Sequence, residues 1–323
     1  MTMDALAGRL AAETDIRTLQ MGQYSGYLDD PSEPAVTRHG LQPDGRFHPG
    51  DVLVDLPAGE PIGDVGYQNC VPAAMALLAQ AWYAAGKEQY NPTLEDTLRI
   101  YEKVSPFRRD PAGAAVASNA AGRAANEADR SAQRPTPAQP ISKHREAHND
   151  FGTSLLLALK VWVHKDQPLA GLLPEARSFL EIEPRNLDQL REAVLRFGGV
   201  LLGLALPQSI KDAQGTLRES WYVPGYGPVY DATAGSLSSH CVAITGFSQR
   251  EFFCLSAGRV RRLSPEFVLT YADEAYTVTP PAALDANPGL RDRISRDVDD
   301  IRRSDRPAGM PAFNHRWRGG NIM

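Results

Sequence analysis

Residues 68–86 read QNCVPAAMALLAQAWYAAG and predict an amphipathic helix that begins with a cysteine. Apolar residues between positions 73 and 82 recur about every 3.6 residues, as they do in a helix with one buried face. Pro72 suits a first helical turn, where its missing N–H would have no partner, and Gly86 ends the pattern. Cys70 therefore stands at a helix N-terminus, where open N–H groups and the helix dipole favour a thiolate.

In residues 239–247, SHCVAITGF, a histidine stands just ahead of an apolar strand predicted over 241–247. An imidazole near a thiol can take the thiol proton, and the resulting ion pair keeps both groups charged near neutral pH. Cys70 and His240 are therefore candidates for a nucleophile and its general base, and we expect their side chains within hydrogen-bond reach. The plainer interpretation makes Cys70 a small buried apolar residue and His240 a core or loop histidine.

The rest of the chain shows further helix and strand patterns. Thr93 and Asp96 match a capping box, and Asn186 and Gly198 bracket another helix. Other helices are expected from 153 and from 264, and strands at 52–54, 200–206, 241–247, 252–256 and 275–279.

These patterns divide the chain into four parts. We expect a loop-rich segment over 1–50, one α+β domain over 51–107 and 151–281, a disordered insertion over 108–150, and a charged flexible tail over 282–323. The insertion is rich in alanine and proline and has almost no large apolar residue, so burial cannot offset its ordering entropy. Residues 285–306 combine many Asp and Arg residues with few apolar ones, which is typical of a solvated helix or a tail.

The composition of the 323 residues excludes several classes of protein. Lys and Arg number 34 against 39 Asp and Glu, and a net charge of −5 does not favour nucleic-acid binding. No run approaches the roughly 18 apolar residues of a membrane helix. The first residues lack the basic-then-apolar order of a secretion signal, and the 3 cysteines are too few for a disulfide framework. We therefore expect a cytoplasmic protein, although export without a leader would leave no trace.

The order of these elements resembles the papain-like cysteine peptidase superfamily, including bacterial double-glycine leader peptidases. A cysteine opens a helix, a histidine opens a strand, and a second strand carries an orienting residue. In that superfamily an Asn or Asp follows the histidine by about sixteen residues. Ser256 stands there, in a run (252–258) that is similar to the papain-type segment around Asn-Ser-Trp-Gly. Residues 184–187 and 273–276 are similar to segments of a group of uncharacterised bacterial and phage papain-like proteins.

The resemblance implies a papain-like α+β fold, with a helical subdomain that carries Cys70 and an antiparallel β subdomain that carries His240. It implies that Ser256 orients the histidine. A papain-like oxyanion site also uses a Gln about six residues before the cysteine, whose amide donates to the developing charge. Asp64 stands at that spacing and offers no such donor, and Gln68, which is not at that spacing, is the candidate that could replace it. A carboxylate would repel the oxyanion, and a serine hydroxyl stabilises an imidazolium less than a carboxylate does.

The activity implied is hydrolysis of an amide bond in a peptide or peptide-like substrate, through a thioester on Cys70 and with no metal or cofactor. One alternative is an inactive papain-like module that binds a protein partner, which Asp64 and Ser256 favour. Another is transfer of the thioester to an amine.

Two aromatic residues in a loop and two cysteines in strands are the remaining candidates. Trp221 and Tyr222 lie in a loop rich in Gly, Pro and Tyr, where they form either a substrate-binding rim or an anchor that packs the loop down. Cys241 and Cys254 fall within apolar strands and are expected in the core.

Overall fold

The computed structural model describes residues 9–10, 12–13, 15, 18–24, 67–85, 90–109, 147–148, 150–248, 250–256 and 259–304. The strand expected at 52–54, Asp64, and residues 110–146 of the expected insertion lie outside this part of the chain. The two ends of the expected insertion pair with each other, since Arg108 is in antiparallel register with His148.

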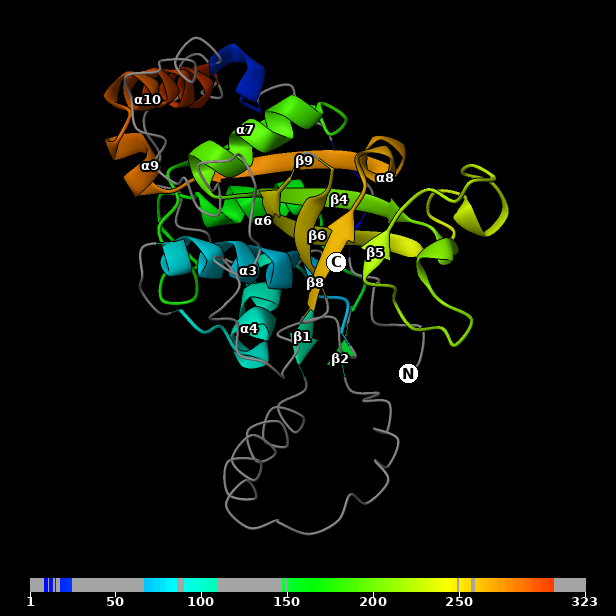
Figure 1. Ribbon diagram of the computed structural model, residues 1–323. Helices are drawn as coiled ribbons and strands as arrows, with labels where there is room; N and C mark the ends of the chain where they lie inside the picture. The colour runs from blue at the N-terminus through cyan, green and yellow to red at the C-terminus, as the bar shows by residue number, and fades with distance from the viewer. Residues whose placement is uncertain are drawn as a thin grey trace, which may run out of the picture.

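The described residues form both helices and strands (Figure 1). The helices are η2 (Met21–Tyr24), α3 (Cys70–Ala85), α4 (Leu94–Val104), α6 (Leu155–Trp162), α7 (Leu187–Phe197), η3 (Gln208–Ile210), η4 (Tyr230–Ala232), α8 (Pro265–Tyr271), α9 (Pro281–Asp285) and α10 (Pro288–Ser304). The strands are β1 (Arg108–Arg109), β2 (Ala147–His148), β3 (Ser178–Ile182), β4 (Val200–Leu206), β5 (Ser220–Trp221), β6 (Ser238–Phe247), β7 (Phe252–Ser256), β8 (Arg259–Leu263) and β9 (Ala272–Thr279).

A seven-stranded sheet runs through the middle of the molecule in the order β3-β9-β4-β6-β7-β8-β5. Its neighbouring strands are antiparallel, except that the short edge strand β5 is parallel to β8. Strand β4 lies between β9 and β6 and is almost entirely buried, which explains its continuous apolar sequence. Helices packed on an antiparallel sheet confirm the expected α+β class.

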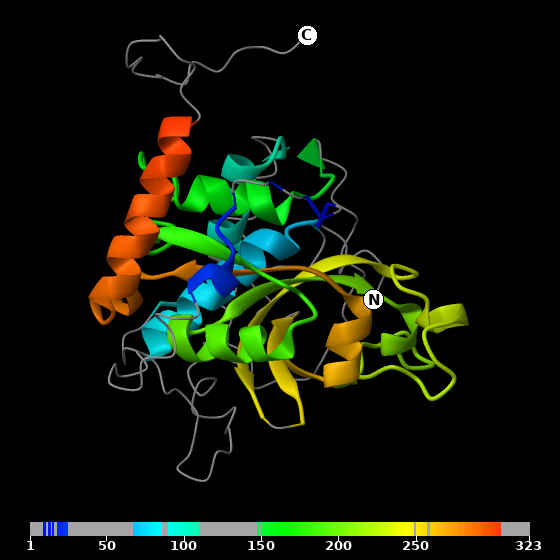
Figure 2. The ribbon, with the colours of Figure 1, turned by 90° about the horizontal axis from the view of Figure 1, so that it is seen from above.

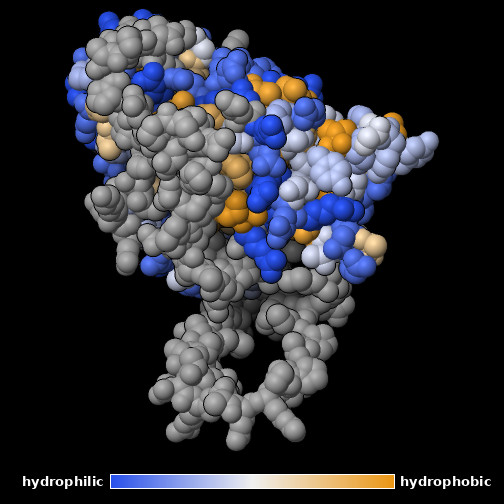
Figure 3. Space-filling model, in the orientation of Figure 1, coloured by the Kyte–Doolittle hydropathy of each residue, from blue (hydrophilic) through white to orange (hydrophobic). Residues whose placement is uncertain are grey.

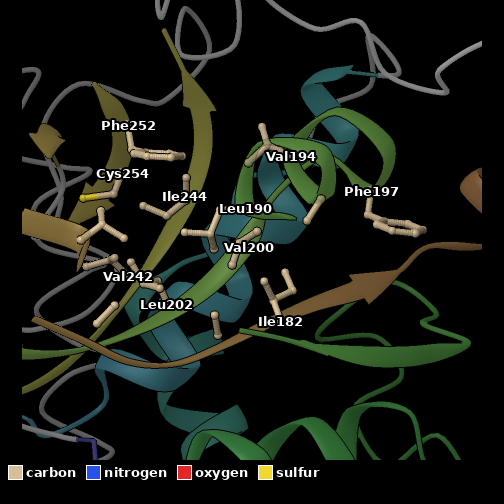
Figure 4. Packing of buried hydrophobic residues seen from close by; sticks show 14 of the residues in the cluster. Ile182, Leu190, Val194, Phe197, Val200, Leu202, Val242, Ile244, Phe252 and Cys254 are labelled. Atoms are coloured by element: carbon tan, nitrogen blue, oxygen red, sulfur yellow. The ribbon is translucent and has the colours of Figure 1, made fainter. Parts of the chain in front are cut away.

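Helices cover both faces of this sheet, and each face has its own apolar cluster. On one side, which we call the α7 face, α7 packs on side chains such as Leu202, Val242 and Ile244 (Figure 4), and apolar residues of α8 and α10 belong to the same cluster. On the other side, the α3 face, α3 packs on β4 and β6, and apolar residues of α4 and α6 join the cluster that contains Leu201 and Ala243. Alternate residues of β4 and β6 thus point to opposite layers, as the two-residue period of a strand requires.

Local signals in the sequence explain where several helices begin and end. The Thr93 side chain accepts from the Asp96 N–H, and the Asp96 side chain accepts from the Thr93 N–H, so the expected capping box at the start of α4 is confirmed. Asn186 caps α7, and Gly198 ends it in the left-handed region at φ 79°. Helix α3 begins at Cys70 itself, as the pattern predicted.

The segment from residue 282, expected as a charged flexible tail, is helical as far as Ser304. For residues 285–306 the structure thus has the helix alternative, but the helix is docked and not merely solvated. Leu290 and Ile294 of α10 are each 2% exposed and join the α7-face cluster, with Val298 packed beside them. These apolar residues recur every four positions and form a narrow stripe on a helix whose other faces are highly charged. The charged composition therefore gave no sign that the helix docks on the protein. Figure 2 shows α10, in orange to red, along one side of the molecule.

The described surface offers no extended apolar area on the face drawn in Figure 3, where hydrophobic residues form small separate patches among hydrophilic ones. None of the described helices has the length and apolar character needed to cross a membrane.

Candidate active site

Cys70 is the first residue of α3, and this helix packs directly against β6. Cys70 is 1% exposed and belongs to the α3-face cluster, which also contains Cys241 of β6. Because neighbouring strand residues point to opposite faces, this shared cluster places α3 on the strand and does not place the ring of His240. The packing therefore brings the N-terminal end of a helix, the environment that favours a thiolate, to the strand that carries the histidine.

His240 is the third residue of β6, so the strand starts earlier than the sequence pattern indicated. Its Nε2 lies 3.0 Å from Oγ of Ser256, the last residue of β7, and both side chains are buried. Ser256 therefore contacts His240 as an orienting residue would. When the hydroxyl accepts from Nε2–H, the neutral ring has its lone pair on Nδ1, the atom that could then take a thiol proton. Hydrogen-bond reach between Cys70 and His240 stays a prediction.

A half-buried carboxylate accepts a hydrogen bond from the chain just before Cys70. The Gln68 N–H donates to Asp150 Oδ1 at 3.0 Å, and the Tyr101 hydroxyl donates to the same oxygen at 3.0 Å. The Gly152 N–H in turn donates to the Tyr101 hydroxyl at 2.8 Å. Burial raises the pKa of the Asp150 carboxyl and also that of the Tyr101 hydroxyl.

Sequence reasoning missed Asp150, because this residue falls at the edge of a segment that was expected to be disordered. The two candidate residues of the oxyanion site, Asp64 and Gln68, remain predictions. Asp64 lies outside the described residues, and Gln68 is partly buried, with its backbone N–H bound to Asp150.

Of the two interpretations of Trp221, the structure supports the anchor and not the substrate rim. It is 1% exposed, its Nε1–H donates to the Arg218 carbonyl at 3.0 Å, and its ring packs at 5.8 Å from the ring of Phe267. Tyr222, the next residue, is 50% exposed and stays a rim candidate.

The two other cysteines are buried, as expected for strand residues of the core. Cys254 lies in the α7-face cluster, and burial raises the pKa of its thiol, which argues against a nucleophilic role. Among the described residues, no group of three or more His, Cys, Asp and Glu side chains gathers as metal ligands would.

An arginine far away in the sequence lies beside the histidine. The Arg9 Nε–H donates to the His240 carbonyl oxygen at 3.1 Å, and the Arg9 guanidinium also pairs with Asp273 and Glu274 at the start of β9. No motif in the sequence pointed to Arg9, because its partners lie in another part of the chain.

Comparison with known proteins was informative only at the level of structure, since no protein-family model and no curated protein matches the chain. Xylellain, a cysteine protease from Xylella fastidiosa, is 13% identical with a TM-score of 0.49, over 86% of this chain and 97% of xylellain. The cysteine protease and lectin-like domains of a surface layer associated protein of Clostridium difficile are 13% identical with a TM-score of 0.39, over 87% of this chain and 63% of theirs.

A digestive procathepsin L2 proteinase from the larval midgut of Tenebrio molitor is 9% identical with a TM-score of 0.40, over 86% of this chain and 79% of the proteinase. All three structures are thus of cysteine proteases or their relatives, but each TM-score is below 0.5. The function proposed below therefore rests on the residues of this chain.

Proposed function

We propose that this chain is a papain-like thiol hydrolase that cleaves an amide bond in a peptide or peptide-like substrate. One observation supports it above all: the helix that begins with Cys70 packs on the strand of His240, whose Nε2 lies 3.0 Å from Ser256 Oγ. A nucleophile, a base and a group that orients the base are thus supplied by three adjoining elements.

In the proposed reaction, Cys70 Sγ attacks the carbonyl carbon of the substrate amide while His240 Nδ1 takes the thiol proton. The backbone N–H of Cys70 donates to the oxyanion that forms. The C–N bond then breaks, the leaving amine receives the proton from His240, and the acyl group remains as a thioester on Cys70. Water attacks the thioester, the carboxylic acid leaves, and the thiol regains its proton through His240.

Cysteine alkylation followed by intact-protein mass spectrometry tests this proposal. At about pH 6 an imidazolium-paired thiolate reacts with iodoacetamide, whereas an ordinary thiol is almost fully protonated. We expect Cys70 to label before Cys241 and Cys254, and His240→Gln to slow its labelling about tenfold or more. His164→Gln is the matched control, because the His164 side chain is 47% exposed at the end of α6 and far from β6 in sequence.

A second candidate is an inactive module of the same architecture that binds a protein partner. The 1% exposure of Cys70 and the hydroxyl at position 256 favour it, because both weaken a thiol nucleophile. Equal and slow labelling of the three cysteines, unaffected by His240→Gln, would support this module and contradict the hydrolase.

A further inference from the structure

The Arg9 side chain is fully buried, although it comes from the N-terminal segment and carries a charge. Its Nη1 lies 2.5 Å from Glu274 Oε1, its Nη2 lies 2.5 Å from Asp273 Oδ2, and its Nε–H donates to the His240 carbonyl. All three guanidinium nitrogens therefore have an oxygen partner, which is the arrangement that specific guanidinium binding requires.

A glycine makes room for this guanidinium. Gly203 of β4 pairs with Cys241 of β6 and with Glu274 of β9, so the guanidinium lies over the central strands of the sheet. A Cβ at position 203 would lie 2.5 Å from Glu274 Cγ and 3.0 Å from Arg9 Cζ. Any larger side chain would fill the space, so the sheet surface here is a pocket of guanidinium size. We call it the Gly203 pocket: Gly203, Asp273, Glu274 and the His240 carbonyl.

The Gly203 pocket adjoins the strand that carries His240. Its rim includes the backbone of His240 itself. The chain of Arg9 and Leu10 runs beside Thr153, where the Leu10 N–H donates to the Thr153 carbonyl at 3.0 Å. Thr153 follows closely on Asp150, which accepts from the N–H of Gln68, two residues before Cys70. A peptide in the place of residues 9 and 10 would therefore run beside Thr153 and reach the backbone of His240.

The Gly203 pocket has more negative charge and more acceptors than Arg9 uses. Two carboxylates face one guanidinium, and Glu274 Oε2 is buried without a hydrogen-bond donor among the described residues. Asp273 is 33% exposed, so one side of the pocket reaches solvent. A closed structural ion pair would need neither the spare acceptor nor the open side.

We propose that the Gly203 pocket recognises an arginine side chain of the peptide substrate, and that Arg9 occupies it as an internal competitor. That the bound peptide is a substrate rests on the proposed function. The existence of the pocket does not, because a binding measurement tests it without catalysis. The ligand class is a peptide with a guanidinium side chain near the bond that is cleaved.

Binding is measured in the full chain with Arg9→Ala and Cys70→Ala, so that no catalysis intervenes. N-acetylarginine amide at about ten times its Kd should raise the Tm of this variant by about 3 °C. N-acetylcitrulline amide, which has the same shape without the charge, should leave the Tm of this variant unchanged. The chain with Cys70→Ala alone should respond to neither, because Arg9 fills the pocket, and adding Glu274→Gln to Arg9→Ala should abolish the response.

Arg177→Ala is the matched control, since Arg177 pairs with Glu175 on the surface, where its side chain is 58% exposed. The pocket is refuted if arginine and citrulline amides act alike, or if the chains with and without Arg9 respond equally. Should Arg9→Ala fail to fold, circular dichroism replaces Tm as the readout. Recovery of the fold with the arginine amide and not with the citrulline amide then supports the pocket, and recovery with neither overturns it.

The response should also depend on pH. Burial raises the pKa of Glu274 to about 7, with Arg9 lowering it and the facing Asp273 and Glu13 raising it further. Removal of Arg9 raises the pKa of Glu274 still further. The guanidinium of the added arginine amide binds Glu274 only when this carboxylate is ionised. The Tm shift of the Arg9→Ala chain should therefore be larger near about pH 8.5 than near about pH 6, and the reverse order would contradict the role of Glu274.

A cleavage assay distinguishes the arginine pocket from the hydrolase activity. In an Arg9→Ala chain that retains Cys70, a peptide amide with arginine should be cleaved about tenfold or more faster than its citrulline analogue. Binding of the arginine amide without any cleavage would keep the pocket and reject the hydrolase. Cleavage without preference for arginine would keep the hydrolase and reject the pocket.

Discussion

At the scale of single residues, the candidate site depends on how one buried ring is held. His240 is fully buried, and its Nε2 has the Ser256 hydroxyl as its partner at 3.0 Å. A buried nitrogen that loses its partner costs more than an average hydrogen bond contributes, because no water replaces it. The hydroxyl at position 256 therefore matters to the fold as well as to the proposed chemistry.

Ser256→Ala should lower the free energy of unfolding by about 1–3 kcal/mol, because it leaves His240 Nε2 buried without its acceptor. Urea unfolding followed by fluorescence measures the change. Ser256→Thr is the control, since it keeps a hydroxyl at the same position and should retain more of the stability. If Ala and Thr variants unfolded at the same urea concentration as the parent chain, the hydrogen bond would have no energetic role.

At the scale of elements, the contact between α3 and α7 aligns the helix of Cys70 with the sheet. The Trp82 Nε1–H of α3 donates to the carbonyl of Phe197, the last residue of α7, at 2.8 Å. Gly198 follows directly, and a Cβ there would lie 2.8 Å from Trp82 Cδ1. The glycine thus ends one helix in a left-handed conformation and admits the indole of another.

Gly198→Ala should destabilise the protein more than the same change at Gly215. Gly198 and Gly215 have φ of +79° and +76°. Alanine at either position is therefore forced into the left-handed region, which costs about 1 kcal/mol of stability. Only Gly198→Ala also displaces Trp82, because nothing lies within 4 Å of a Cβ at position 215. The difference between the two unfolding free energies measures the clash. Equal losses would show that Trp82 moves aside without cost.

At the scale of the whole molecule, segments from both ends of the chain pack onto one central sheet. Tyr24 of η2 is fully buried, and its hydroxyl donates to Asp297 Oδ2 of α10 at 2.9 Å. Arg9 reaches the opposite layer and contacts the strand of His240. The N-terminal segment therefore joins the C-terminal helix, the sheet and the candidate site.

Ile294→Ala should lower the free energy of unfolding by about 2–4 kcal/mol, because Ile294 is 2% exposed in the α7-face cluster. Arg296→Ala on the exposed side of the same helix should change it by less than about 0.5 kcal/mol. Chemical denaturation of both variants measures the contrast. A tail that does not dock would show equal and small effects, which would restore the original expectation for residues from 282 onward.

Local patterns in the sequence were enough to predict much of the framework. The start of α3 at Cys70, the capping box of α4, the caps of α7 and the bounds of β4 and β7 follow from periodicity and capping groups within a few residues. The contact of His240 with Ser256 was implied by the resemblance to papain-like peptidases, and the two residues lie in one β-hairpin. In each case the determining interactions are local.

The remaining features depend on contacts between residues that are far apart along the chain. Arg9 meets Asp273 and Glu274, and Trp221 is buried against Phe267, only once the sheet has formed. A charged arginine and a tryptophan in a loop look the same in the sequence whether they face water or a partner. Their roles are set by the packing of distant segments, because burial decides whether a charge must be paired and whether an aromatic ring is an anchor or a surface.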